Sequence, residues 1–346
     1  MPWKWMATAV LVIGAIVAAL VLREWHALYQ QPLEIAEPQV VEIERGMGFS
    51  TLARELESRG WVSDSMPLRV WARLTGEGDT IRAGEYQVTP GTTVPELVSM
   101  LERGDVIQYR FTLVEGWTFA QMLEAMHQHE AIENTLGEVD PEQVMPLLGF
   151  RELHAEGWFL PDTYQFPRGT TDRQILQRAH DRMRGVLEDA WESRQQDLPL
   201  NTPYDALILA SIIERETGRP EERETVAGVF VRRLERNMRL QTDPTVIYGV
   251  DAEDFDGRLR YRHLRTDTPY NTYTRHGLPP TPIAMPGEAS IRAAVNPDDS
   301  EYLYFVSRGD GSHHFSRSLD EHNRAVRKYQ LGEDVELETE GGPAND

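Results

Sequence analysis

One pattern of residues occurs three times between positions 40 and 122, and it restricts the fold more than any other feature of the chain. Each copy starts with a stretch in which apolar and polar residues largely alternate, at 40–45, 86–89 and 111–115. A glycine follows, then an apolar residue three positions later and Leu or Met six positions later; the glycines are Gly46, Gly91 and Gly116. Alternation is typical of a half-buried strand, and glycine favours a tight turn. The pattern therefore predicts a strand–turn–helix unit used three times, which places the chain in the α+β class.

Two of the predicted helices also carry a signal for their first turn. Thr93 with Glu96, and Thr118 with Gln121, have the spacing of capping boxes. Around residues 40–108 the order of strand, turn and helix resembles a LysM module, so a small LysM-like domain is expected there. That resemblance implies carbohydrate binding. The alternative is a plain α+β unit without a glycan ligand, because such units recur in many proteins.

The N-terminal segment from Met6 to Leu22 contains no charged residue, with Lys4 before it and Arg23 after it. Its length is at the short end for a helix that spans a bilayer, and tryptophans on both sides are typical of membrane interfaces. We therefore expect an uncleaved signal anchor at residues 1–24, a polar stalk at 25–39 and an exported body. A cleaved signal peptide is the alternative, although no small-x-small cleavage pattern follows the apolar run.

Charge and cysteine content exclude several classes of function. The chain has 56 acidic and 35 basic residues, a formal net charge of −21, whereas proteins that bind nucleic acids present basic surfaces. The absence of cysteine excludes disulfide frameworks, thiolate zinc sites and cysteine nucleophiles. His313 and His314 lack a glutamate at helical metal-ligand spacing, so neither a metal nor a cofactor is expected. Residues 331–346 are acidic without a basic residue, and we expect a disordered tail.

A long apolar helix is predicted at residues 203–217, with Thr202 at its cap position. Its apolar residues occur on nearly all sides, so the helix is expected to be buried. Glu216 lies on the same stripe as Leu209 and Ile212, and it stands in the last turn, where the helix dipole disfavours an anion. Both effects raise the pKa of a carboxyl group. A carboxylic acid that stays protonated near neutral pH is what glycosidic cleavage requires of a general acid.

Glu214 is two residues from Glu216 and therefore points to nearly the opposite side of the helix, so the two cannot face one cleft. Glu214 can instead pair with Arg215 or with another basic group. The alternative is that both glutamates are solvated at the end of a core helix, and periodicity alone favours neither interpretation.

Two later loops, at 238–249 and 270–283, combine amides, hydroxyls, a carboxylate and aromatic rings around prolines. Rigid loops of this composition are typical of polyol-binding sites, although turn chemistry alone also explains the Asn, Gly and Pro content. An earlier aromatic loop at 156–164 either lines a groove or is pinned to the core by its rings. The candidate substrate-binding residues from these segments and from the helix are Gln241, Thr242, Asp243, Tyr248, Asn271, Tyr273, Trp158 and Glu214.

Six stretches of the sequence together resemble one known family. These are residues 156–163, 210–217, 239–249, 270–274, 277–280 and 302–306. In this order they resemble the YceG-like family, the MltG-type endolytic murein transglycosylases. The resemblance covers nearly the whole chain and implies an anchor, the LysM-like domain at 40–108 and a mixed α+β catalytic domain at 109–330. It also implies that Glu216, the second glutamate of its Glu-x-Glu-Thr run, is the essential acid.

The resemblance further implies the reaction and its setting. The substrate would be the glycan strands of peptidoglycan, cut at the β-1,4 bond from N-acetylmuramic acid to N-acetylglucosamine. The product would carry a 1,6-anhydro end, with Gln241, Asn271 and Tyr273 holding sugars. The protein would sit in the cell inner membrane by a single pass, with its body in the periplasm. There it would terminate nascent strands beside peptidoglycan synthases.

Two other functions stay open at the level of sequence. One is a non-catalytic scaffold that binds peptidoglycan, which would have no use for a raised-pKa acid on an apolar stripe. The other is an ordinary glycoside hydrolase. That enzyme would require a second carboxylate across the cleft, for which Asp162 and Asp243 are the candidates.

Overall fold

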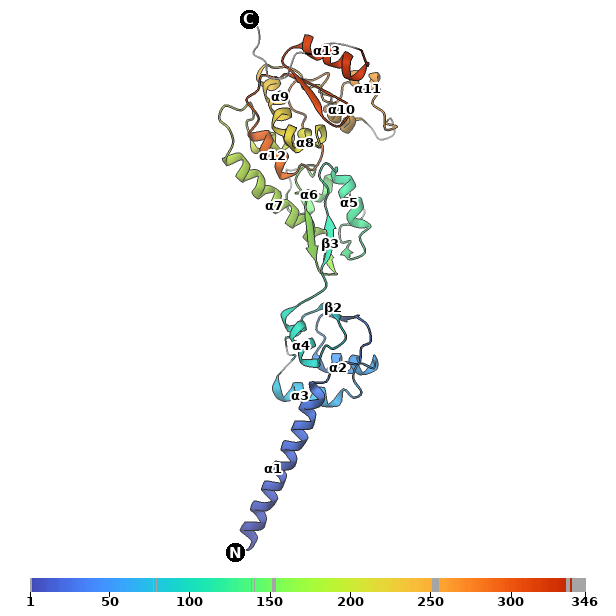
Figure 1. Cartoon of the computed structure of the whole chain (residues 1–346), viewed down its shortest axis with the longest axis vertical. Coiled ribbons are helices and arrows are strands. Elements are labelled where there is room, and N and C mark those ends of the chain that lie inside the picture. The colour runs from blue at the N-terminus through green and yellow to red at the C-terminus, as the bar shows by residue number, and fades with distance from the viewer. Residues whose placement is uncertain are drawn as a thin grey trace. The chain divides into compact units, whose positions relative to one another are not determined.

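The computed structural model describes residues 2–76, 78, 80–137, 139, 141–150, 154–250, 255–333 and 337. Most of the predicted acidic tail therefore lies outside the described residues. The chain divides into two compact units (Figure 1). The first comprises Met1–Arg110 and Gln165–Gly169, and the second comprises Phe111–Tyr164 and Thr170–Asp346.

The first unit is built around a pair of strands and the helices that pack on it. Helix α1 (Pro2–Tyr29) precedes β1 (Gln39–Ile43), α2 (Phe49–Ser58), α3 (Met66–Thr75), β2 (Gly84–Val88) and α4 (Val94–Arg103). Strands β1 and β2 are antiparallel, with Gln39 opposite Val88 and Ile43 opposite Gly84. The buried faces of these strands and helices form one hydrophobic core.

The prediction of a membrane anchor at residues 1–24 is not confirmed. Helix α1 covers this segment, but among the described residues no helix combines the length and the apolar content that a membrane crossing requires. Several side chains of the predicted anchor, those of residues 1–7, 9, 10, 21 and 24, lie outside the described residues. The helix continues to Tyr29, into the segment predicted as a stalk.

The boundary between the two units falls within β3 (Tyr109–Thr112) and β5 (Thr163–Phe166), and the second unit contains the remaining strands and helices. Its first part holds α5 (Phe119–His127), β4 (Ile132–Glu133), α6 (Pro141–Leu147), β6 (Thr170–Thr171) and α7 (Asp172–Glu192). Its second part holds α8 (Pro203–Glu216), the 3-10 helix η1 (Pro220–Glu222), α9 (Arg223–Glu235), α10 (Asp243–Gly249), α11 (Tyr261–Arg265), α12 (Glu288–Val295), β7 (Tyr304–Ser307), β8 (His313–Ser316) and α13 (Leu319–Gln330). Strand β3 pairs with β5, β4 pairs in parallel with β6, and β7 forms an antiparallel hairpin with β8.

The three predicted strand–turn–helix units are present as β1 with α2, β2 with α4 and β3 with α5. Gly46, Gly91 and Gly116 have φ angles of 83°, 92° and 77°, a region in which any side chain is strained, so glycine is required at each turn. The capping boxes of Thr93 and Thr118 are both formed. The mixed α+β class is therefore confirmed, whereas the LysM-like assignment of the first unit stays a prediction.

Helix α8 is the central element of the second unit. Thr202 caps it by accepting a hydrogen bond from the Asp205 backbone N–H, and the Asp205 side chain completes the capping box. Residues 206–213 are buried on every side, and the helix contacts α7, α9, α10 and α12. A helix enclosed in this way has a fixed position, and Glu216 lies at its less buried C-terminal end.

Candidate active site

The last residue of α8, Glu216, lies where the buried helix meets a polar loop. Leu209 and Ile212, which precede Glu216 on the same stripe, are fully buried. The side chain of Glu216 is half-buried, and its Oε1 accepts a hydrogen bond from the Thr242 hydroxyl. Burial raises the pKa of the Glu216 carboxyl to about 7, partly opposed by the Thr242 hydrogen bond. The carboxyl is therefore poised to hold its proton near neutral pH and to release it.

The donor to Glu216 is itself fixed by its surroundings. Thr242 is buried, and its backbone N–H donates to the Thr272 hydroxyl at 3.1 Å. The Thr245 hydroxyl donates to the Thr242 carbonyl at 2.8 Å, in the first turn of α10. The preceding residue, Gln241, adopts a φ of 52°, a strained conformation for a residue with a side chain. Strain beside a buried donor of this kind is typical of a functional site.

A carboxylate and a phenol lie beside this pair. The Tyr273 hydroxyl donates to Asp243 Oδ1 at 2.6 Å. Asp243 is exposed, and its negative charge contributes to the raised pKa of Glu216. Burial, together with Asp243, also raises the pKa of the Tyr273 phenol, so the phenol remains an uncharged donor.

A buried cation completes the electrostatics, and the sequence reasoning missed it. Arg233 on α9 is only 7% exposed, and its guanidinium donates to the carbonyls of Leu303 at 2.7 Å and Leu240 at 2.8 Å. It also lies over the Tyr304 ring, 4.9 Å from the centroid. Its positive charge lowers the pKa of Glu216, opposing the effect of burial. The signal was a lone arginine on the apolar face of a helix, which indicates a buried charge with fixed partners.

This arrangement can donate and recover a single proton. The carboxyl of Glu216 is neutral when burial dominates, and the anion is stabilised by the Thr242 hydroxyl and the Arg233 charge. A group balanced between its two protonation states acts first as an acid and then as a base.

Glu214 does not face this site. Its Oε2 accepts from the Gly287 backbone N–H at 3.0 Å and from the Ser290 hydroxyl at 2.7 Å, at the start of α12. Its Oε1 lies 3.9 Å from the Arg223 guanidinium. The side chain is 7% exposed, so Glu214 ties α8 to α12 and α9 rather than projecting into a cleft.

Two other candidate binding residues, Asn271 and Trp158, make structural contacts in this geometry, and their direct contact with substrate stays a prediction. Asn271 has no exposed surface, and its Nδ2 donates to three backbone carbonyls of residues 263–266. Its Oδ1 accepts from the Tyr273 backbone N–H at 2.9 Å, which shapes the loop that carries the phenol. Trp158 is 8% exposed and stacks on Tyr204 with 5.8 Å between ring centroids, so it pins its loop to the core.

Tyr248 belongs to a second acidic centre that the sequence reasoning also missed. Its hydroxyl donates to Glu156 Oε2 at 3.0 Å, and the Phe119 backbone N–H donates to Glu156 Oε1 at the same distance. Glu156 is 3% exposed, and burial raises the pKa of its carboxyl to about 7. The sequence signal was a single carboxylate at the start of the aromatic loop.

Of the predicted site residues, the structure brings together Glu216, Thr242, Asp243 and Tyr273. Gln241, which is exposed, directly precedes Thr242 in the sequence.

The chain is similar in sequence to proteins named endolytic murein transglycosylase. It is 28% identical over 306 residues to that of Bacillus subtilis (strain 168), and the matched segment covers 84% of each chain. It is 24% identical over 328 residues to the endolytic murein transglycosylase of Streptococcus pneumoniae serotype 2, covering 84% of this chain and 58% of that protein.

A crystal structure described as a putative yceG-like protein from Listeria monocytogenes is 28% identical. It covers 84% of this chain and 99% of its own, with a TM-score of 0.49. A model of the YceG-like family matches residues 41–328. The predicted family is therefore confirmed, and the chain belongs to the YceG-like family.

Proposed function

We propose that this protein is an endolytic murein transglycosylase that cuts glycan strands without adding water. The bond is the β-1,4 link from N-acetylmuramic acid to N-acetylglucosamine, and the product carries a 1,6-anhydro end. The names of two relatives that match 84% of the chain support the substrate and the reaction class. The single observation that carries the chemistry is Glu216, a carboxyl with a pKa raised to about 7 beside fixed donors.

The reaction needs one proton carrier. The Glu216 carboxyl gives its proton to the leaving glycosidic oxygen as the C1–O bond breaks and an oxocarbenium-like state forms. The resulting carboxylate removes the proton from the C6 hydroxyl of the muramic residue, and the C6 oxygen bonds to C1. The enzyme ends with Glu216 protonated again, so atoms and charge balance over one turnover. An intramolecular nucleophile reacts at high effective concentration, and an activated water is not required.

The neighbours of Glu216 serve the two halves of this cycle. Asp243 favours the protonated acid before cleavage, because its negative charge raises the pKa of Glu216. After proton transfer the Thr242 hydroxyl and the Arg233 charge stabilise the carboxylate. The Tyr273 phenol, held by Asp243, and exposed Gln241 are the proposed sugar contacts.

The substrate places the proposed activity outside the cytoplasm, where murein is assembled. Endolytic cleavage there would terminate growing strands, and proximity to peptidoglycan synthases would follow from that role. A membrane anchor is not required by the proposed chemistry.

A hydrolytic reaction is the second candidate, because Asp243 is an exposed carboxylate close enough to influence Glu216. In that reaction Asp243 would activate a water or attack C1, and the product would carry a reducing end. Its hydrogen bond to Tyr273 and its place in the first turn of α10 favour a structural role instead.

The test is product analysis of purified, peptide-free glycan strands incubated with the full chain. We expect products whose muramic ends are lighter by one water than reducing ends, as measured by mass spectrometry. Glu216→Gln should release no product while keeping its fold. Reducing ends from the wild type would replace the proposal by hydrolysis. A lack of cleavage by folded wild-type protein would favour the scaffold.

A further inference from the structure

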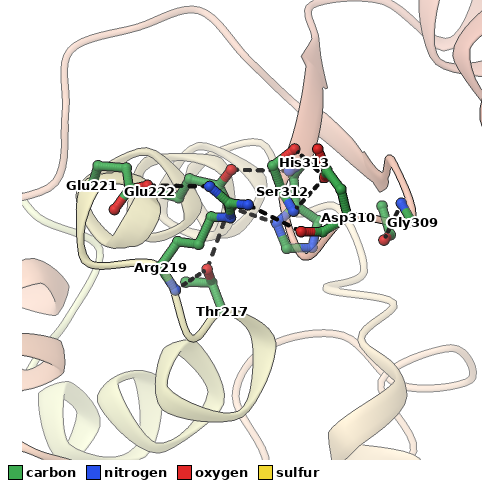
Figure 2. Close-up of polar contacts among 9 residues, drawn as sticks. Thr217, Arg219, Glu221, Glu222, Gly309, Asp310, Ser312 and His313 are labelled. Carbon is green, nitrogen blue, oxygen red and sulfur yellow. Dashed lines mark hydrogen bonds and ion pairs between the residues drawn. The ribbon is translucent and has the colours of Figure 1, made fainter.

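A chain of hydrogen bonds runs from the residue after Glu216 to the hairpin β7–β8 (Figure 2). The Thr217 hydroxyl donates to Glu222 Oε2 at 3.3 Å and accepts from the Arg219 backbone N–H at 3.0 Å. His313 meets the same carboxylate twice: its backbone N–H lies 2.9 Å from Glu222 Oε1, and its ring Nδ1 lies 2.7 Å from Glu222 Oε2. Residues far apart in sequence thus converge on one carboxylate.

The three side chains in this hydrogen-bond network, Thr217, Glu222 and His313, are largely shielded from water. Thr217 is 2% exposed, and the side chains of Glu222 and His313 are 11% and 12% exposed. Charge-assisted hydrogen bonds are strong under such conditions. A carboxylate has no proton to donate, so Nδ1 of His313 carries the hydrogen in this contact. The relevant property of His313 is therefore a donor at the Nδ1 position.

Thr217 matters because of how α8 ends. Helices commonly end at a glycine in the left-handed conformation, but Thr217 leaves α8 in an extended conformation, with φ −135° and ψ 130°. Its N–H still donates to the Ile213 carbonyl at 3.2 Å. The direction of the chain after Glu216 is then set by the Thr217 hydroxyl and its partner Glu222. Without these contacts the last turn would fray, and the Glu216 carboxyl would lose its fixed position against Thr242.

A second contact also connects the segment that follows α8 to the hairpin β7–β8. The Arg219 guanidinium Nη2 donates to the Asp310 carbonyl at 3.0 Å, at the tip of the hairpin. The hairpin tip is in turn closed by Ser312, whose N–H and hydroxyl donate to Asp310 Oδ1 at 2.9 and 2.6 Å. His313 therefore contacts Glu222 from a hairpin whose turn is held by hydrogen bonds.

We propose that His313 and Glu222 are positioning residues, which act through Thr217 to hold Glu216 in its reactive orientation. The inference rests on the proposed function, because it assigns these residues a task in the proton transfer by Glu216. Neither residue is required to touch the sugar. The hairpin β7–β8 thereby becomes part of the catalytic apparatus, although it lies about ninety residues from α8 in the sequence.

The first test compares His313→Asn with His313→Ala in steady-state cleavage of glycan strands. The Asn amide nitrogen occupies nearly the position of Nδ1 and can donate to Glu222. We expect His313→Ala to lower kcat by about 10- to 100-fold with KM within about twofold of wild type, because a small misplacement of a catalytic group has that effect. His313→Asn should recover most of kcat. Loss of kcat to the same extent in both variants would overturn the proposal and indicate a role for Nε2.

The second test addresses the hydroxyl and includes a matched control. Thr217→Val removes the hydroxyl at constant shape and should lower kcat, whereas Thr217→Ser keeps it and should not. Glu222→Gln should lower kcat, whereas Glu221→Gln should not, because the contact of Glu221 among the described residues is the exposed Arg219 side chain at 3.4 Å. Equal effects at Glu221 and Glu222 would contradict the proposal. The Thr217 pair remains informative where a His313 variant fails to fold.

A readout independent of activity separates this inference from the proposed function. The NMR carboxyl resonance of isotope-labelled Glu216, assigned by its absence in Glu216→Gln, should shift in His313→Ala and return in His313→Asn. If the wild type releases no anhydro product, the proposed function fails while the resonance still tests positioning. If the wild type is active and the resonance stays unchanged in His313→Ala, the positioning role is wrong.

Discussion

Replacing Glu216 by Gln should change how the stability of the protein depends on pH. Gln imitates the protonated carboxyl, since its carbonyl can still accept from Thr242. The pKa of Glu216 is raised from 4.5 to about 7, and each pKa unit corresponds to about 1.4 kcal/mol. The contribution of Glu216 to the free energy of unfolding therefore changes by about 3 kcal/mol between pH 4.5 and about pH 7. This value is an upper bound, because the side chain is partly exposed.

The sign follows from proton linkage. Between about pH 4.5 and 7 the unfolded chain loses the Glu216 proton while the folded chain keeps it. The stability that Glu216 contributes is thus fully present below pH 4.5 and is lost as pH rises through about 7. Urea unfolding of wild type and Glu216→Gln, followed by circular dichroism from about pH 4 to pH 8, measures the difference.

The wild type should become less stable relative to Glu216→Gln by up to about 3 kcal/mol over this range and then level off. Glu156→Gln provides an independent comparison, because burial also raises the pKa of Glu156 to about 7 and the same decline is expected. A difference between wild type and Glu216→Gln that is constant with pH, or that grows in the opposite direction, would refute a raised pKa at Glu216.

Further perturbations test other parts of the account. The logarithm of kcat/KM should fall with unit slope above about pH 7, since Glu216 must be protonated to act as an acid; initial rates from about pH 5 to 9 measure this. Thr242→Val should lower kcat about 10- to 100-fold and raise the pKa seen in that profile, because it removes a hydrogen bond to the anion. Glu214→Gln should reduce activity far less than Glu216→Gln in the same assay, because Glu214 contacts α12. Thr93→Ala should destabilise the first unit by about 1 kcal/mol in urea unfolding, through loss of its capping box.

Local features of this fold could be predicted from the sequence. The capping boxes at Thr93 and Thr118 and the start of α8 at Thr202 depend on residues three positions apart, and all three are present. The position of Glu216 at the end of a buried stripe also followed from helical periodicity. Its raised pKa, argued from that stripe, agrees in direction with the effect of burial in the folded chain.

The remainder of the site depends on contacts between distant residues. Thr242 is 26 residues from Glu216, and Arg233 donates to a carbonyl 70 residues away, so periodicity could not pair them. Asn271 shows how the folded loop adds contacts that its composition does not indicate. Its amide had the chemistry of a sugar ligand, but three backbone carbonyls within eight residues satisfy it. Unpaired backbone carbonyls in an irregular loop compete for such amides, and composition does not reveal that competition.

The central claim is that Glu216 alone moves the proton and that the C6 hydroxyl of the substrate, not water, attacks C1. Cleavage of purified glycan strands in heavy-oxygen water, followed by mass spectrometry of the new muramic ends, tests it directly. We predict anhydro ends without heavy oxygen from the wild type and no cleavage by Glu216→Gln. Heavy oxygen at the new ends, or anhydro ends released by Glu216→Gln at the wild-type rate, would contradict the account.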